Sequence, residues 1–367
     1  MGRFDKDRFL KELAVRYCLT RGAIPFLEVV VHSVADLSDT VEVLTDLDVL
    51  GIEAVGDGGL RRIIFDCKTK NRMSSVNRSF WAAGVKDYTG CDEAFLILKA
   101  KAVHNHRISA LAIDVDLHDE ESFKDLGRTA DPAFPRIDCY QASIERWNAV
   151  HVCYENNRWA ENLYDLARNV VPLTKTPWST FRRILAELRN ARGFIDPEKG
   201  AHIAVFLDVL ASAFVLWAAM GRDIRRFYEP TMVKPALEKV LRYYLWGGKE
   251  SYKIRQKIED FRQQIQDKAT PNNVGPVELP AWDGLVSFVG LIVSAPQNIL
   301  ECAHVCRELS IRMVSSSDTA FDKALSERLK ANSRIRQFSV GLSDYLVAAG
   351  KLPKDMATRV QTTLFDA

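Results

Sequence analysis

Two patterns of apolar residues divide the chain. Up to about residue 130, short runs of β-branched and aromatic residues alternate with stretches of helical spacing, which is typical of an α/β domain. Beyond this point, apolar residues recur almost throughout at helical spacing. Two prolines within Asp131–Arg136 favour an extended linker between the two patterns. We therefore predict an α/β domain over residues 1–130 and an all-α domain over residues 131–367.

The first 130 residues contain clear strand and helix signals. Apolar residues at helical spacing predict a first helix over Asp5–Thr20, with Gly22 as a stop. The remaining predicted elements are a strand over 23–33, a hairpin over 45–70, a helix from Ser74, strands over 93–102 and 108–115 with a polar turn between them, and a helix over 120–126.

The second part is predicted to be helical over 145–157, 159–170, 178–192, 202–220, 234–246, 249–266, 281–293, 297–313, 318–331 and 335–349. Ile203–Met220 is apolar enough to approach the ~20 residues that span a bilayer, and Asp208 is its only charged residue. The alternative is the central helix of an all-α domain, apolar all round because other helices surround it. We favour the central helix and expect no membrane association.

Charged residues interrupt both strands of the predicted hairpin. Side chains alternate along a strand, so Asp46 shares a face with Asp48, and Asp66 shares a face with Lys68. If the hairpin folds about Asp57, Asp48 lies opposite Asp66 and within cross-strand reach. Two carboxylates and an ammonium then meet in one small patch. An ordinary hairpin with a charged solvent face is the alternative, but it does not explain acids between apolar neighbours on both strands.

Such a patch suits metal-assisted hydrolysis. Carboxylates held a few ångströms apart repel one another, and the repulsion falls if they share a hard divalent cation. A lysine beside that cation could orient or deprotonate a water molecule and counter the charge of a phosphate. The pattern therefore indicates a hydrolase that acts on phosphodiesters.

At this point the chain resembles a family. Leu47–Leu50, a spacer and then Ile63–Thr69 look like the core of the PD-(D/E)XK, or restriction-endonuclease-like, nuclease superfamily. The resemblance implies a central mixed sheet flanked by helices, with Asp48 as the first catalytic acid and Asp66 and Lys68 as the Asp-x-Lys pair. It also implies that Mg²⁺ or Mn²⁺ binds Asp48, Asp66 and the carbonyl group of Cys67.

Four further residues are candidates for this predicted site. In the resembled fold the first helix may offer a glutamate to the metal, and Glu12 is the only glutamate on that helix; a solvated side chain is the alternative. Lys70, Arg72 and Arg78 follow the hairpin and would hold the phosphates beside the scissile bond, unless each is simply solvated.

Composition indicates a cellular location for the protein but does not indicate its substrate. The formal net charge is +2, so any nucleic-acid binding must come from local patches. The seven cysteines include no Cys-x-x-Cys motif, and the charged N-terminal residues contain no signal-peptide pattern. We therefore expect a cytoplasmic protein.

The leading hypothesis is a metal-dependent nuclease, with DNA favoured and antiviral defence suggested by analogy. The alternative is a catalytically silent nuclease fold that binds nucleic acid or a protein partner through its helical part. Homo-oligomerisation stays open.

Overall fold

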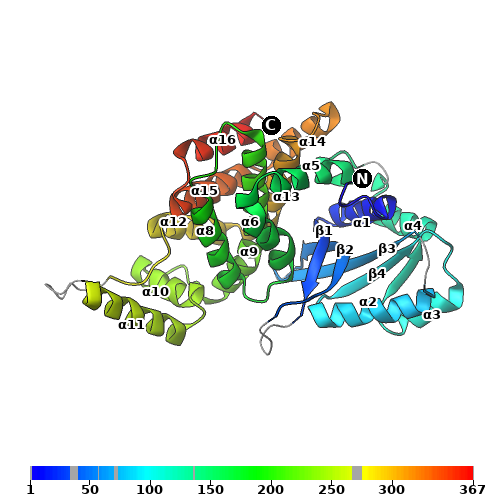
Figure 1. Ribbon diagram of the computed structural model, residues 1–367, viewed down its shortest axis with the longest axis horizontal. Helices are drawn as coiled ribbons and strands as arrows, with labels where there is room; N and C mark the ends of the chain where they lie inside the picture. The colour runs from blue at the N-terminus through cyan, green and yellow to red at the C-terminus, as the bar shows by residue number, and fades with distance from the viewer. Residues whose placement is uncertain are drawn as a thin grey trace.

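A mixed five-stranded sheet forms the centre of the N-terminal part (Figure 1). The computed structural model describes residues 2–33, 40–56, 58–69, 73–134, 137–266 and 275–366. The strands lie in the order β1-β2-β3-β4-β5, with antiparallel pairing from β1 to β3 and parallel pairing from β3 to β5. Their bounds are β1 Ile24–His32, β2 Val43–Ala54, β3 Leu60–Lys68, β4 Glu93–Leu98 and β5 Asp116–Asp119.

Helices cover both faces of this sheet. The helices α1 (Arg8–Thr20) and α4 (Glu120–Ala130) lie on one face, and α2 (Ser75–Thr89) and α3 (His104–Leu111) lie on the other (Figure 1). An aromatic cluster holds the first layer in place. Phe65 of β3 stacks on Phe95 of β4 with ring centroids 5.1 Å apart, and Tyr17 and Phe123 pack around this pair. The expected mixed sheet flanked by helices is therefore confirmed.

One predicted strand is wrong. Residues 108–115 were expected as a strand after a polar turn. Instead, residues 108–111 are the second half of α3, residues 112–115 form a turn, and the short β5 follows them. Two apolar side chains of this segment, Ile108 and Leu111, are 55% and 69% exposed, while Ala110 is the buried residue of α3. Strands β4 and β5 are parallel, and parallel neighbours need a crossover connection. Helix α3 supplies that connection.

The remainder is helical, as predicted. Its α-helices are α5 Ile144–Glu155, α6 Glu161–Asp165, α7 Val171–Leu173, α8 Pro177–Ala191, α9 Gly200–Phe227, α10 Lys234–Leu245, α11 Lys249–Gln266, α12 Trp282–Ser294, α13 Ile299–Arg312, α14 Thr319–Ala331, α15 Ser333–Gly350 and α16 Lys354–Phe365. The sequence reading did not include α16. The predicted helix over 159–170 is broken into the 3₁₀ turn η4 (Arg158–Ala160), α6 and the π-helical segment η5 (Leu166–Val170).

Helix α9 is the central helix of this part. It is long and apolar enough to cross a membrane, but 89% of its most apolar 18-residue window is buried inside the protein. Asp208, the charged residue within Ile203–Met220, is fully buried between two arginines, 3.0 Å from Arg168 Nε and 2.7 Å from Arg307 Nε. The Tyr154 hydroxyl donates a further hydrogen bond of 2.8 Å to Asp208. The preferred prediction of a buried core helix is thus confirmed.

The sheet and the helices share a continuous hydrophobic core. Polar contacts cross between them: Arg307 donates to the Pro25 carbonyl oxygen at 3.4 Å, and His304 Nε2 lies 3.1 Å from the Gly22 carbonyl oxygen. The predicted linker over 131–136 takes part in this packing up to Phe134, which is fully buried; residues 135 and 136 lie outside the described part of the chain. The helical part therefore holds β1 in a fixed position.

Candidate active site at the end of the β2–β3 hairpin

Strands β2 and β3 form the predicted hairpin in the predicted register. The ladder pairs Ala54 with Leu60 at one end and Val49 with Phe65 at the other. One further step in this register sets Asp48 opposite Asp66. The turn residue Asp57 lies outside the described residues. The alternation of apolar residues keeps Leu50, Ile64 and their neighbours in the core, so the acids at this end are fixed by the strands that carry them.

Asp48, Asp66 and Lys68 converge. The Lys68 Nζ atom lies 2.6 Å from Asp48 Oδ2 and 3.0 Å from Asp66 Oδ1. The backbone N–H group of Cys67 donates a hydrogen bond of 2.8 Å to the same Asp48 oxygen. Both aspartates are buried, at 3% and 5% exposure, whereas Lys68 is partly open to solvent. Two carboxylates and one ammonium thus form a compact patch at the carboxyl end of β3.

Burial and charge shift the pKa values in this patch. Burial raises the pKa of Asp48, and the neighbouring Asp66 raises it further, against the opposing effect of Lys68. Burial alone would lower the pKa of Lys68, but the two carboxylates outweigh it and raise that pKa above its ordinary value. Lys68 is therefore a firmly protonated cation here and is suited to counter negative charge rather than to accept a proton.

Arg78 is held by Asp66. The Arg78 guanidinium contacts both oxygens of Asp66: its Nε contacts Oδ2, and its Nη2 lies 2.7 Å from Oδ1. The same guanidinium stacks 3.9 Å above the ring centroid of Trp81, so α2 supplies both groups. Arg78 had been predicted to bind phosphate. In this structure Asp66 and Trp81 position it at the edge of the site as a second cation beside Lys68.

A group of three carboxylates lies on the other side of Asp48. One ligand oxygen from each of Glu28, Asp46 and Asp48 can be chosen so that all lie within 4.8 Å of one another. Glu28 is in β1 with a backbone φ of 49°, in the left-handed region that non-glycine residues rarely adopt. Its neighbours Leu27 and Val29 pair with Val49 and Leu47 of β2, so Glu28 lies beside Asp48. This acidic trio could hold a metal ion.

The trio carries its own charge compensation. Lys11 of α1 is completely buried, contacts Glu28 and lies 3.9 Å from Asp48 Oδ1. Burial and a hydrogen bond with Asp46 raise the pKa of Glu28 to about 7. Burial is the largest cause of this rise, so the carboxyl group holds a proton more readily than usual, and the charge of Asp48 adds to the effect. A divalent cation could replace this proton and relieve the repulsion, so the donor set fits a hard metal ion.

The other predicted site residues are placed differently. The Glu12 carboxylate accepts the Ile144 N–H at 3.2 Å and pairs with Arg8, so it closes the start of α5 and does not join the acidic trio. The helix does contribute to the site, but through Lys11. The thiol of Cys67 is buried; a metal-binding role for its carbonyl group stays a prediction. Lys70 and Arg72 lie outside the described residues.

The sequence reading missed Glu28 and Lys11, although both leave a signal. Glu28 is the single charged residue in the apolar run over 26–31, and Lys11 interrupts the apolar face formed by Leu10, Leu13 and Ala14. A charged residue in such a position is buried and needs a partner. Here each one is the partner of the other.

Comparison with known proteins adds nothing to this geometry. No known protein family, curated protein or solved structure matches the chain. The function must therefore be argued from the site itself.

Proposed function

We propose that the protein is a metal-dependent nuclease that hydrolyses phosphodiester bonds, with Mg²⁺ or Mn²⁺ at the acidic trio. The observation that carries the proposal is the convergence of Asp48, Asp66 and Lys68 at one end of the hairpin. Asp48 belongs both to this patch and to the acidic trio. Phosphodiester hydrolysis by this mechanism needs both the acidic groups and the cationic groups. Carboxylates hold the cation, and fixed positive groups counter the charge that develops on the phosphate.

Each residue has a distinct part. Glu28, Asp46 and Asp48 would hold the ion, which would supply Lewis acidity toward a phosphoryl oxygen and lower the pKa of a water molecule. Lys68 is a cation with a firmly held proton, so its part is to bind and orient the phosphate. Asp66 holds Lys68 and Arg78 in position through direct ion pairs, and therefore acts as a positioning residue.

A cleavage assay tests this function. The full chain is incubated with end-labelled double-stranded DNA, single-stranded DNA and RNA, with Mg²⁺, Mn²⁺ or EDTA. We expect cleavage that needs the metal, most strongly on DNA, and a loss of at least about 100-fold in Asp48→Ala. The matched control is Asp116→Ala, which removes an exposed carboxylate at the start of β5, at the other end of the sheet. Full activity in Asp48→Ala, or no cleavage of any substrate, would refute the proposal.

A second function, protein binding through α11, has its own observation. Helix α11 lies with α10 at the outer end of the helical part (Figure 1). Four large apolar side chains follow one face of this otherwise polar helix at intervals of four, three and four residues, and all are at least 59% exposed: Ile254, Ile258, Phe261 and Ile265. This spacing is the seam of a coiled coil, and such a face is normally covered by another helix.

The charged residues that flank this seam indicate which kind of helix could bind to it. The flanking positions hold Arg255, Lys257 and Arg262, while the acidic one, Glu250, lies 3.2 Å from Lys253. In an antiparallel pair of α11 helices, Arg255 would face Arg262. In a parallel pair, Lys257 would face Arg262, and the attraction of Glu250 to Arg255 would only offset this repulsion. The seam therefore suits an acidic amphipathic helix of a partner protein.

Binding of a designed peptide tests this second function. A fluorescent helix with a matching apolar seam and glutamates at its flanks should bind the full chain, and Ile258→Glu should remove the binding. The control is Gln263→Glu, which adds the same charge to α11 outside the seam. A dimer in light scattering that the Ile258→Glu variant does not form would contradict the assignment. Binding to anionic vesicles that depends on Ile258, with no binding to the peptide, would also contradict it.

A further inference from the structure

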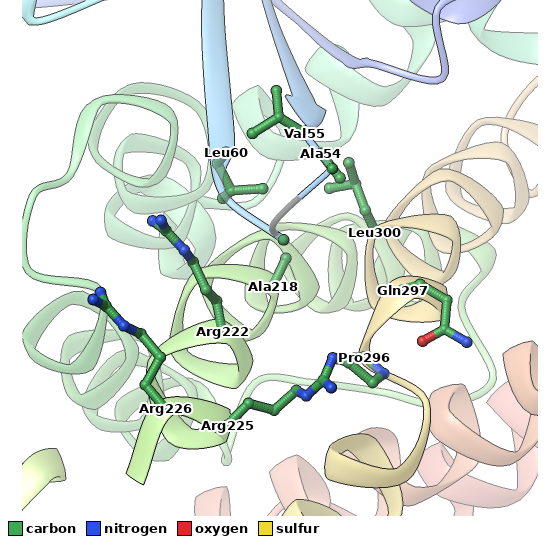
Figure 2. Close-up of a pocket in the computed structure, with 12 residues that line it drawn as sticks. Ala54, Val55, Leu60, Ala218, Arg222, Arg225, Arg226, Pro296, Gln297 and Leu300 are labelled. Atoms are coloured by element: carbon green, nitrogen blue, oxygen red, sulfur yellow. The ribbon is translucent and has the colours of Figure 1, made fainter.

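A pocket lies at the opposite end of the β2–β3 hairpin (Figure 2). Its walls come from three places: the tip of the hairpin, the last turns of α9, and the segment that opens α13. The cavity has a volume of about 750 Å³, which is within the range of small-molecule sites. Twelve residues line it: Ala54, Val55, Gly56, Gly58, Leu60, Ala218, Arg222, Arg225, Arg226, Pro296, Gln297 and Leu300.

The charged residues that the structure describes around this pocket are all arginines. Arg222, Arg225 and Arg226 line it from the last two turns of α9, and none of the twelve described lining residues is acidic; Asp57, between Gly56 and Gly58, lies outside the described residues. Figure 2 shows Arg225 extending toward Pro296, whereas Arg222 and Arg226 extend in the opposite direction. Within the part of the chain that the structure describes, Arg225 and Arg226 make no ion pair and are exposed. Arginines near a helix C-terminus also stabilise the helix dipole, but that effect does not require a cavity beside them.

The remaining walls define the shape and size of a ligand. Leu60, Ala218 and Leu300 form apolar surface, and Gln297 offers an amide group. A bare inorganic anion would use the arginines and leave this apolar surface uncovered. An organic phosphate would use both, because its phosphates can form charge-assisted hydrogen bonds with guanidinium groups while its body covers the apolar wall.

The pocket is separate from the acidic site. Leu60 and Lys68 are the two ends of β3, and at ~3.3 Å per residue they are about 26 Å apart. A phosphate ester bound beside Arg225 is therefore too far away to be the bond that the acidic site would cleave. The pocket does, however, lie between the hairpin and the helical part, so its ligand would contact both.

We propose that this arginine pocket binds a small organic phosphate of nucleotide size. The exposed guanidinium groups of Arg225 and Arg226 hold the phosphates, and Leu60, Ala218 and Leu300 contact the rest of the molecule. The proposal does not depend on nuclease activity, because it rests on other residues at the far end of the hairpin.

Calorimetric titration with ATP, AMP and inorganic pyrophosphate, in EDTA, tests the proposal on the full chain. We expect ATP to bind and inorganic pyrophosphate to bind more weakly. The double variant Arg225→Ala/Arg226→Ala should weaken ATP binding by at least about tenfold, because two charge-assisted contacts are lost. Asp48→Ala should bind ATP as the wild type does, which separates this result from that of the cleavage assay.

Two matched variants complete the experiment. Arg189→Ala/Arg192→Ala removes the same charge from exposed positions of α8 and the residue after it, outside the pocket, and should leave the ATP affinity unchanged. Ala218→Phe fills the cavity without removing charge and should weaken ATP binding. The proposal fails if ATP does not bind, if the α8 control weakens binding equally, or if pyrophosphate binds as tightly as ATP and Ala218→Phe has no effect. The last result would mean that exposed arginines attract anions without a ligand-sized site.

Discussion

Two groups of buried charges differ in how they are compensated. In the helical part, the fully buried Asp208 lies between Arg168 and Arg307 and accepts a hydrogen bond from Tyr154. At the end of the hairpin, acids outnumber the cations that contact them: Glu28, Asp46, Asp48 and Asp66 against Lys11, Lys68 and Arg78. Burial raises the pKa of Glu28 to about 7. The first group has two cations for its single acid. The second has more acids than cations.

This difference separates a structural role from a functional one. Arg307 also donates to the Pro25 carbonyl oxygen, so the Asp208 group joins α9 and α13 to the sheet. Removing one member of a compensated buried group leaves an unpaired charge and lowers stability. The acid-rich group at the hairpin costs stability in the absence of a ligand, and such a cost is typical of sites that bind a cation. Variants in the two groups should therefore separate activity from stability.

The largest expected effect is on activity. Replacing the cation in Lys68→Met should lower the cleavage rate by about 10²–10³-fold, because the charge that faces the phosphate is lost. The chain should remain folded, since Lys68 is partly exposed and its two carboxylate partners can take up a proton. Cleavage rate and circular dichroism are measured on the same samples. Retained activity would contradict the catalytic role of Lys68. Loss of the folded signal in circular dichroism would contradict the claim that this group affects activity and not stability.

The largest expected effect on stability comes from the other group. Asp208→Ala leaves Arg168 and Arg307 buried without their shared acid, and should lower the free energy of unfolding by about 3–5 kcal/mol. Urea denaturation measures this change. The control is Asp223→Ala on the same helix, which removes a partly buried hydrogen bond to Tyr244 and should cost only about 1 kcal/mol. Equal effects of the two variants would contradict a special role for Asp208.

A smaller, pH-dependent effect is expected where α13 meets the sheet. Burial lowers the pKa of His304 from 6.5 to about 4, so this side chain is neutral in the folded protein. The unfolded chain binds the proton more readily, and stability should fall as the pH drops from about 6.5 to 4, by up to about 3 kcal/mol. The fall should level off below the folded pKa.

The His304→Gln variant isolates this effect. An amide can still donate to the Gly22 carbonyl oxygen, 3.1 Å from His304 Nε2, but it does not titrate. Urea denaturation at several pH values should therefore give a flatter curve between pH 4 and 6.5 for His304→Gln than for the wild type. Parallel curves would assign the acid sensitivity to other groups.

Strand alternation made the hairpin predictable. The positions of Asp48, Asp66 and Lys68 relative to one another follow from a period of two residues and one turn, and the structure has this register. The rest of the site depends on features that periodicity does not encode. Glu28 reaches Asp48 because one residue of β1 adopts a positive φ, and such a departure from regular strand geometry follows from packing around it.

Helix α1 shows the same limit more sharply. Successive residues of a helix point about 100° apart. The helix itself was predicted correctly, but the sequence does not define its rotation about its own axis, and this rotation decides which residue faces the site. The residue of α1 that faces the site is Lys11, whereas the resemblance implied Glu12. Helix α3 was missed because Ile108 and Leu111, which suggested a buried strand, are exposed.

The smallest expected effect is that of Glu12→Gln, which tests whether Glu12 of α1 faces away from the metal site. In Glu12→Gln an amide oxygen can still accept the Ile144 N–H, and the ion pairs with Arg8 and Arg16 are lost. We expect about 0.5 kcal/mol of lost stability and unchanged cleavage. Glu28→Gln is the matched change on the other glutamate, and it should abolish the rise in melting temperature that Mg²⁺ or Mn²⁺ gives the wild type. If Glu12→Gln removes the metal response and Glu28→Gln retains it, the acidic trio is the wrong metal site.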